Sequence, residues 1–294
     1  MSGSTSTPVR IGTRGSRLAL IQTEIVAERL KKAGFEVEVV PIVTTGDRRP
    51  AGMSAQDGWF TRVLREALEA GDIDLAVHSA KDLPIEAETR TALVFLERAD
   101  PRDALVTRER VPLDGLAPGA TVGTDSVRRA GFLRAARPDL RVVPLHGNVP
   151  TRIEKLERGD ADALVLAAAG LDRLGLAARI DQLLEPEVMP PAPAQGALAI
   201  ELASLRSALG EAVAALGDSR VTAAVHAERS VLKAMGGGCR SPLGALAEIV
   251  DGELGLLAGV PGRVLRRQAR LADQDRLVQE VTERLIEEET WQAR

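Results

Sequence analysis

The feature that most constrains this chain is an alternation of short apolar segments with amphipathic segments over its first two-thirds. Short apolar runs bounded by turn residues are typical of buried strands. The strand-like segments are 9–13, 35–43, 73–78, 91–97, 119–124, 140–145, 161–168 and 197–202. Segments with helical periodicity lie between or after them, at 16–33, 59–71, 126–138, 149–159 and 204–216. This alternation predicts an α/β architecture with mainly parallel sheets. In the first helix we expect Leu18, Ile21, Ile25 and Leu30 to form the apolar stripe.

The C-terminal part has a different pattern. A helix near 219–235 is followed by three segments, 243–250, 253–260 and 263–271, that predict antiparallel strands. Asp251-Gly252 separates the first two and is typical of a hairpin turn. The last segment, 275–289, predicts a helix with its apolar residues inward, namely Leu277, Val281 and Leu285. We therefore expect a small α+β domain, a three-stranded antiparallel sheet with helices.

Two breaks suggest where domains meet. Residues 97–106, ERADPRDALV, could cross from one α/β domain to another, and residues 185–197 are the most proline-rich stretch. The predicted division is 1–97 plus 195–216 for the first α/β domain, 98–194 for the second, and 217–294 for the α+β domain. A chain of 294 residues is long enough for more than one core.

Composition excludes several classes of function. The net charge is −4 and aromatic residues make up 2%, which argues against nucleic acid binding by charge or base stacking. The N-terminus has no apolar signal region, and no apolar run reaches the length of a membrane span. One cysteine and three dispersed histidines predict neither a disulfide nor a metal site. We expect a cytoplasmic protein without membrane, metal or nucleic acid partners.

Two segments resemble each other. RIGTRGSRLAL (residues 10–20) and TVGTDSVRRAG (121–131) each place Gly-Thr after a strand, then a serine and arginine at a helix start. Free N–H groups at a helix N-terminus, with serine and arginine, can bind an anion. Alternatively, Ser16 and Ser126 only cap their helices. If both segments bind anions, a ligand with several carboxylates in a cleft between the two α/β domains fits them.

Polar residues follow other strands as well. DLAVHSAKDLP (74–84) brings His78, Ser79, Lys81 and Asp82 to a strand end, and PLHGNVPTR (144–152) does the same with His146 and Arg152. Ligands of parallel sheets bind beyond the carboxyl ends of the strands. A lysine beside an aspartate is, alternatively, an ordinary solvated loop pair.

The single cysteine lies in AMGGGCRSPLG (residues 234–244). A lone thiol is commonly a small buried apolar group, but the glycines before Cys239 remove steric cover. Arg240 could lower the pKa of the thiol but cannot accept its proton, so a nucleophile would lack a base. The loop therefore fits a covalent anchor at least as well as a catalytic nucleophile.

Nine motifs together resemble the porphobilinogen deaminase family, in the family's order from about residue 9 to residue 290. They are GTRGS, AVHSAKDLP, DPRDA, GTDSVRR, HGNVPTR, AAAGLDRLG, APAQGALAIE, HAERSVL and GGGCRSPLGA. The resemblance implies two α/β domains of periplasmic-binding-protein type and a third domain that anchors a dipyrromethane cofactor by a thioether to Cys239. It also implies a monomeric transferase that joins four porphobilinogen molecules head to tail, releases ammonia each time, and frees the linear tetrapyrrole by hydrolysis.

The resemblance also implies roles for individual residues. Asp82 matches the catalytic aspartate. The residues expected around the cofactor are Ser79, Lys81, Ser126, Arg128, Arg129 and Arg152. Those expected around the substrate are Arg14, Ser16, His146, Arg173 and Gln195.

Two positions depart from the family pattern. His146 stands where the family usually has an arginine that binds substrate carboxylate, and Asp57 stands where many members have lysine. Both changes put substrate affinity and chain elongation in doubt, because they remove positive charge from sites for an acidic ligand. Three alternatives stay open: a solute-binding protein of the same α/β type, a binding or regulatory protein with weakened catalysis, and a cysteine-dependent transferase.

Overall fold

The computed structural model describes residues 7–42, 59–85, 91–238 and 241–287. The chain divides into two compact units. One unit comprises Met1–Glu97 and Ala197–Thr222, and the other comprises Arg98–Gly196 and Ala223–Arg294. The chain thus crosses from the first unit to the second, returns, and crosses again within a helix, α7 (Ser219–Ala234).

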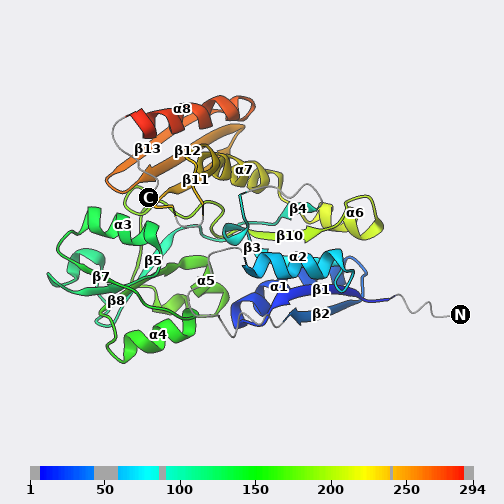
Figure 1. The fold of residues 1–294 in the computed structure, drawn as a ribbon, viewed down its shortest axis with the longest axis horizontal. Coiled ribbons are helices and arrows are strands. Elements are labelled where there is room, and N and C mark those ends of the chain that lie inside the picture. Colours follow the sequence, from blue (N-terminus) through cyan, green and yellow to red (C-terminus); the bar gives the residue numbers. More distant parts are fainter. Residues whose placement is uncertain (1–6, 43–58, 86–90, 239–240, 288–294) are drawn as a thin grey trace, which may run out of the picture. The chain divides into compact units, whose positions relative to one another are not determined.

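The first unit contains a five-stranded sheet in the order β2-β1-β3-β10-β4 (Figure 1). Its strands are β1 (Val9–Arg14), β2 (Val37–Ile42), β3 (Leu75–Ser79), β4 (Ala92–Phe95) and β10 (Leu198–Leu202). Strand β1 runs parallel to β2 and β3, whereas β10 is antiparallel to both of its neighbours. Its helices are α1 (Arg17–Lys32), α2 (Trp59–Glu69) and α6 (Ala208–Ala215).

Helices α1 and α2 cover opposite faces of this sheet. Val26 and Leu30 of α1 pack with Ile11 and Leu75, whereas Leu64 of α2 packs in a separate cluster with Ala76 and its neighbours. Leu75 and Ala76 are adjacent in β3, and adjacent strand residues point to opposite faces. Because helices cover both faces, polar side chains can gather on the loops at the carboxyl end of the sheet.

The second unit repeats this arrangement in a sheet ordered β7-β6-β8-β5-β9. Its strands are β5 (Asp103–Thr107), β6 (Thr121–Gly123), β7 (Arg141–Val143), β8 (Ala163–Ala167) and β9 (Gln182–Leu183). Strand β6 is parallel to β7 and β8, and β5 is antiparallel to β8 and β9. The helices are α3 (Val127–Ala136), α4 (Val149–Glu157) and α5 (Ala168–Arg173), with Phe132 of α3 in one apolar cluster and Ile153 of α4 in another.

In each of these sheets, four strands run in one direction and one runs against them. The reversed strand is β5 in the second unit and β10 in the first, and each comes directly after the chain has crossed between units. The prediction of mainly parallel sheets therefore holds for four strands of each sheet. Strands β5 and β9 were not predicted, because β5 lies within the segment that was assigned to the crossing and β9 has only two residues.

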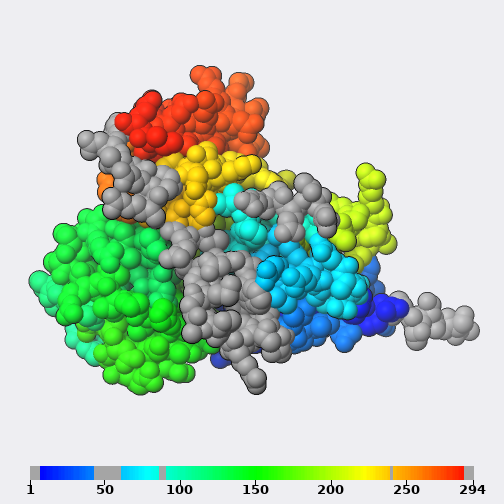
Figure 2. Space-filling view, viewed as in Figure 1, coloured from blue at the N-terminus to red at the C-terminus, as the bar shows by residue number. Residues whose placement is uncertain are grey.

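The third sheet has the order β11-β12-β13 and is antiparallel throughout. It consists of β11 (Gly244–Val250), β12 (Glu253–Val260) and β13 (Arg263–Arg270). Asp251 and Gly252 have φ angles of 50° and 80°, as the predicted tight hairpin turn requires. Helix α8 (Gln274–Glu287) packs on β12 and β13 through Leu277 and other buried residues, and its outer side lies at the surface (Figure 2). The predicted fold class, two α/β parts and a small α+β part, is confirmed.

The apolar stripe of α1 differs from the prediction. Leu30 is buried as expected, but Leu18, Ile21 and Ile25 are only half-buried. The buried face instead includes the polar residues Gln22 and Thr23. Hydrogen bonds satisfy both, since Gln22 contacts Ser79 and the Thr23 hydroxyl donates to the carbonyl of Ala19. A hydropathy pattern alone cannot identify polar residues that are buried with partners.

A buried glutamate ties the third sheet to the second α/β sheet within one unit. Glu228 of α7 accepts hydrogen bonds from both terminal nitrogens of Arg98, at 2.6 and 3.1 Å. It also accepts from the backbone N–H groups of Ala194 and Ala247, at 2.6 and 2.7 Å. Arg98 and Ala194 lie near the first two crossings of the chain, and Ala247 lies in β11. One carboxylate therefore joins three segments that are distant in sequence.

We predict that Glu228→Gln destabilises the second unit by about 3–5 kcal/mol, because the largely buried guanidinium of Arg98 loses its counter-charge. Urea denaturation followed by circular dichroism measures this loss. Glu187→Gln is the control, since Glu187 pairs with Arg266 of the same unit at the surface, and a much smaller change is expected. Equal effects of the two substitutions would contradict the role given to Glu228.

Candidate active site

The loop between β1 and α1 has the features predicted from its sequence. Ser16 is the N-cap of α1, and its hydroxyl accepts a hydrogen bond from the backbone N–H of Ala19 at 3.3 Å. Arg14 ends β1 and is half-buried. A side chain at Gly12 would collide with Ile73, so this glycine allows β1 to approach its neighbour closely. The loop places an arginine and a helix N-terminus together at the carboxyl end of β1.

Strand β3 ends at the same edge, because β1 and β3 are parallel neighbours. Beyond Ser79, the residues Ala80–Asp82 form one short 3₁₀ turn. Lys81 is half-buried and Asp82 is exposed. The backbone carbonyl of Asp82 accepts a hydrogen bond from the hydroxyl of Thr61 in α2, at 3.4 Å. The turn thus fixes the backbone of Asp82 and leaves its carboxylate open to solvent.

Ser79 already has a partner within the unit. Its hydroxyl oxygen lies 3.0 Å from Nε2 and 3.2 Å from Oε1 of Gln22, which is buried in α1. The contact joins the end of β3 to the helix that Ser16 caps.

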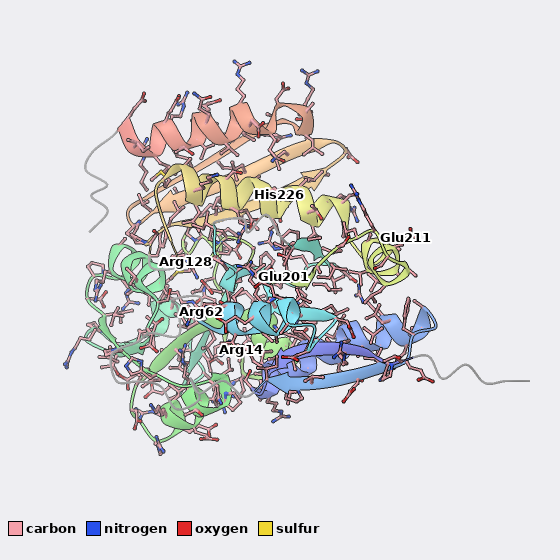
Figure 3. All side chains as sticks on the ribbon, turned by 45° about the vertical axis from the view of Figure 1, so that its right-hand side comes forward. Arg14, Arg62, Arg128, Glu201, Glu211 and His226 are labelled. Carbon is pink, nitrogen blue, oxygen red and sulfur yellow. The ribbon has the colours of Figure 1, made fainter. Side chains whose placement is uncertain are left out.

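Behind this edge lies a buried charged cluster centred on Glu201 of β10 (Figure 3). Oε1 of Glu201 is 2.6 Å from Nε of Arg65 and 2.6 Å from the hydroxyl of Thr91. Oε2 lies 3.0 Å from Nε2 of His78 in β3. Burial alone raises the pKa of the Glu201 carboxyl, but the contacts with His78, Thr91 and Arg65 outweigh burial and lower that pKa to about 2. Glu201 is therefore ionised at neutral pH and holds β3 and α2 to β10.

In the second unit, three residues expected to bind ligand converge on one buried aspartate. Arg128 donates through Nη2 to Asp103 at 2.7 Å, and Arg129 donates through Nη2 at 2.8 Å. Gln195 donates through Nε2 to the same carboxylate at 2.9 Å. Burial alone raises the pKa of Asp103, but the two guanidinium charges outweigh burial and hold that pKa well below its ordinary value. Arg128 also donates to the carbonyl of Pro190.

The carboxyl ends of β6 and β7 carry a second group of polar residues. Ser126 caps α3 and accepts a hydrogen bond from the backbone N–H of Arg129 at 3.3 Å. The neighbouring Asp125 contacts both Arg152, at 3.2 Å, and Nδ1 of His146, at 2.9 Å. Nε of Arg152 is buried and has no hydrogen-bond partner among the residues that the structure describes.

Arg173 lies at the end of α5 and donates to the backbone carbonyl of Gly196 at 2.7 Å. Burial lowers the pKa of Arg173 and outweighs the opposing charge of Asp172. Arginine remains charged under these conditions. The predicted residues Cys239, Arg240 and Asp57 lie outside the described residues.

Within the described ranges, no group of three or more His, Cys, Asp or Glu side chains could hold a metal ion. The same ranges contain no helix that is both long and apolar enough to cross a membrane.

Comparisons with known proteins decide the family. Residues 9–211 match the model of the porphobilinogen deaminase dipyrromethane cofactor binding domain, and residues 222–290 match that of the porphobilinogen deaminase C-terminal domain. The chain belongs to the porphobilinogen deaminase family. The porphobilinogen deaminase of Roseiflexus castenholzii is 47% identical over 87% of this chain and 88% of its own length. That of Nocardia farcinica is 45% identical over 94% of this chain and 84% of its own length.

Among solved structures, the second substrate binding domain of a putative amino acid ABC transporter from Streptococcus pneumoniae is similar, with 15% identity and a TM-score of 0.48. The match covers 78% of this chain and 95% of the transporter domain.

The domain model that matches residues 9–211 is named for a dipyrromethane cofactor, and the described residues suit such a group. Its carboxylates require cationic and N–H donors. The buried Nε of Arg152, which has no partner in the described part of the chain, and the N-terminus of α3 are donors of this kind. Arg128 is less available, since its two terminal nitrogens are occupied by Asp103 and Pro190.

Sequence reasoning missed the acidic members of this site. Asp103, Asp125 and Glu201 were not singled out, nor was Arg65, the partner of Glu201. Asp125 could have been found, because it stands inside the motif GTDS next to the serine that was chosen. The other three meet partners that are distant in sequence, and nothing in the local pattern identifies those partners.

We predict that Glu201→Gln removes a pH-dependent part of the stability of the first unit. A carboxyl with a lowered pKa stabilises the fold fully above its ordinary pKa of 4.5, and this contribution is lost as pH falls through about 2. The contribution is about 3 kcal/mol. Urea denaturation should show a large gap between wild type and variant at pH 7 that narrows towards pH 3. The exposed Glu97, substituted by Gln, is the control and should show no such trend. A gap that stays constant with pH would contradict the prediction.

Proposed function

We propose that this chain is a porphobilinogen deaminase: it joins four porphobilinogen molecules head to tail on a dipyrromethane primer and then releases the linear tetrapyrrole by hydrolysis. The observation that carries the proposal is Asp82. Its carboxylate is exposed on a short turn whose backbone is held by Thr61, at the strand end beside Lys81 and Arg14. The family assignment covers nearly the whole chain and includes this motif.

Asp82 suits the reaction because the substrate becomes positively charged. When the C–N bond of the aminomethyl group breaks, ammonia leaves and positive charge spreads over the pyrrole ring. A carboxylate beside the pyrrole N–H stabilises that charge. It can also accept and return a proton as the new C–C bond forms. Asp82 is thus proposed to act on the reacting ring, and a neutral amide at this position could do neither.

The cationic residues suit the acidic groups of the ligand. Each pyrrole unit carries an acetate and a propionate, and arginine pairs with carboxylates through two parallel hydrogen bonds. We propose that Ser79, Lys81, Ser126, Arg129 and Arg152 contact the cofactor, and that Arg14, Ser16, His146, Arg173 and Gln195 contact the substrate. Arg128 is proposed to support the cofactor region through Asp103. When bound, the dipyrromethane supplies the primer on which the first substrate unit is joined.

The attachment of this primer to Cys239 by a thioether is also proposed. We also propose the division into three domains, 1–97 plus 195–216, 98–194 and 217–294. The second of these and most of the third, from Ala223 onward, belong to one compact unit. Finally, we propose that the protein acts as a monomer in the cytoplasm.

The first test is the intact mass of the purified protein beside a Cys239→Ser variant. We expect the wild type to carry the extra mass of two linked pyrrole units, either as purified or after incubation with porphobilinogen, and the variant to lack it. A thiol that stays unmodified while porphobilinogen is not consumed would overturn the proposal in favour of a binding or regulatory protein.

The second test is Asp82→Asn. We expect kcat for porphobilinogen consumption to fall by about a hundredfold to ten-thousandfold, because the amide neither stabilises positive charge nor transfers protons. The intact mass reports whether the variant still carries the cofactor. Asp72→Asn is the matched control, since Asp72 is an exposed aspartate in the turn before the opposite end of β3. A kcat within a few-fold of wild type in Asp82→Asn would remove Asp82 from the mechanism.

A further inference from the structure

One acidic side chain lies among the groups that are proposed to bind carboxylates. Asp125 follows β6 and directly precedes Ser126, the N-cap of α3. Its Oδ2 lies 3.2 Å from Nη2 of Arg152, and its Oδ1 lies 2.9 Å from Nδ1 of His146. The Asp125 side chain is 19% exposed and that of Arg152 is 21% exposed, so water screens this pair only partly. A single carboxylate therefore contacts one residue proposed for the cofactor and one proposed for the substrate.

The corresponding loop of the first unit carries the opposite charge. Gly12-Thr13 lies near the end of β1 and Gly123-Thr124 lies at the end of β6, the equivalent strand, and Ser16 and Ser126 cap the helices that follow. Between these shared residues, the first unit has Arg14-Gly15 and the second has Asp125. The two loops share one architecture, but the second places an anion where the first places a cation.

The positive charge of Arg152 is partly compensated within the protein. Burial lowers the pKa of Arg152, Asp125 opposes that change, and the nearby charge of Arg129 adds to it. Asp125 therefore supplies the counter-charge that the protein itself offers to Arg152. Its hold is incomplete, since only Nη2 is bonded to Asp125 and the buried Nε has no partner among the described residues. An incoming carboxylate would find one arginine nitrogen available and another occupied by a carboxylate of the protein.

We propose that Asp125 is a specificity-determining residue that acts as an internal counter-ion, competing with ligand carboxylates for Arg152 and His146. This inference rests on the proposed function. A ligand carboxylate that binds Arg152 must either displace Asp125 or lie close to it, and two like charges at such distances repel. Asp125 thus weakens binding of the acidic pyrrole chain. Weaker binding favours movement of the growing chain past this end of the second-unit sheet, and disfavours tight retention of any one pyrrole unit.

His146 fits the same account. By resemblance the family usually has an arginine here, and this chain combines a histidine with the neighbouring Asp125. The side chain of His146 is 71% exposed, so it can leave Asp125 without a large loss of buried contact. Lys155 donates to the backbone carbonyl of His146 at 2.9 Å and holds the loop while the imidazole moves. Of the two partners of Asp125, His146 is therefore the one that can be displaced. Arg152 is the one for which Asp125 and a ligand carboxylate compete.

The test compares kcat and KM for porphobilinogen in wild type and Asp125→Asn, which keeps the size of the side chain and removes its charge. We expect KM to fall by about three- to tenfold with kcat within about twofold, because Arg152 is freed for the ligand. Asp139→Asn is the matched control: Asp139 forms a similar aspartate–arginine pair with Arg137 beyond the C-terminal end of α3, and KM should not change. Asp125→Ser is a second variant in case the amide disturbs the loop.

A double-mutant cycle distinguishes competition from a structural effect. In an Arg152→Gln background the same Asp125→Asn change should lower KM by less than about twofold, since the contested cation is gone. An unchanged or raised KM in both Asp125 variants, or an equal gain in the Arg152→Gln background, would overturn the inference. A wild type that consumes no porphobilinogen would instead overturn the proposed function, and the inference would fall with it.

Discussion

Burying a carboxylate is costly unless cations and N–H groups surround it, and three wholly buried carboxylates among the described residues organise this chain. Asp103, Glu201 and Glu228 each collect partners from segments that are far apart in sequence. Glu201 brings α2 and β3 to β10, and Asp103 brings the first turn of α3 to β5. Glu228 brings the segments of the first two crossings to α7 and β11. Removing any one of these carboxylates leaves a largely buried arginine without its counter-charge, so each cluster enforces one arrangement of its segments.

The clusters around Glu201 and Asp103 adjoin the segments that carry the candidate functional residues. His78, which contacts Glu201, is followed in the chain by Ser79, Lys81 and Asp82. Arg128 and Arg129, which bind Asp103, occupy the first turn of the helix that Ser126 caps. The equivalent strand order of the two five-stranded sheets brings the same kind of loop to each edge. Positions of functional groups thus follow from buried electrostatics as much as from apolar packing.

The sequence allowed the fold class to be predicted because strand and helix periods and turn residues are local properties. The hairpin at Asp251-Gly252 and the inward face of α8 followed from such local patterns. Strand β5 was missed because it pairs with β8 and β9, which come much later in the chain, and no local pattern indicates that pairing. The motif Ser79–Asp82 was found from its position after a strand. Glu201 was missed because it lies inside an apolar strand and meets Arg65 across 136 positions, a separation no local rule can span.

Arginine content alone does not identify a binding site for an acidic ligand, and burial separates the arginines of this chain by role. Arg128 gives its terminal nitrogens to Asp103 and Pro190, and Arg98 gives both of its own to Glu228, so their charges are already compensated. Arg152 keeps a buried nitrogen that no described residue pairs with, and it meets Asp125 through only one atom. An incoming carboxylate gains most binding free energy at a cation that is shielded from water but only partly paired with carboxylates of the protein. By that criterion the affinity of the second unit for an acidic ligand depends more on Arg152 and its competitor Asp125 than on the paired arginines of α3.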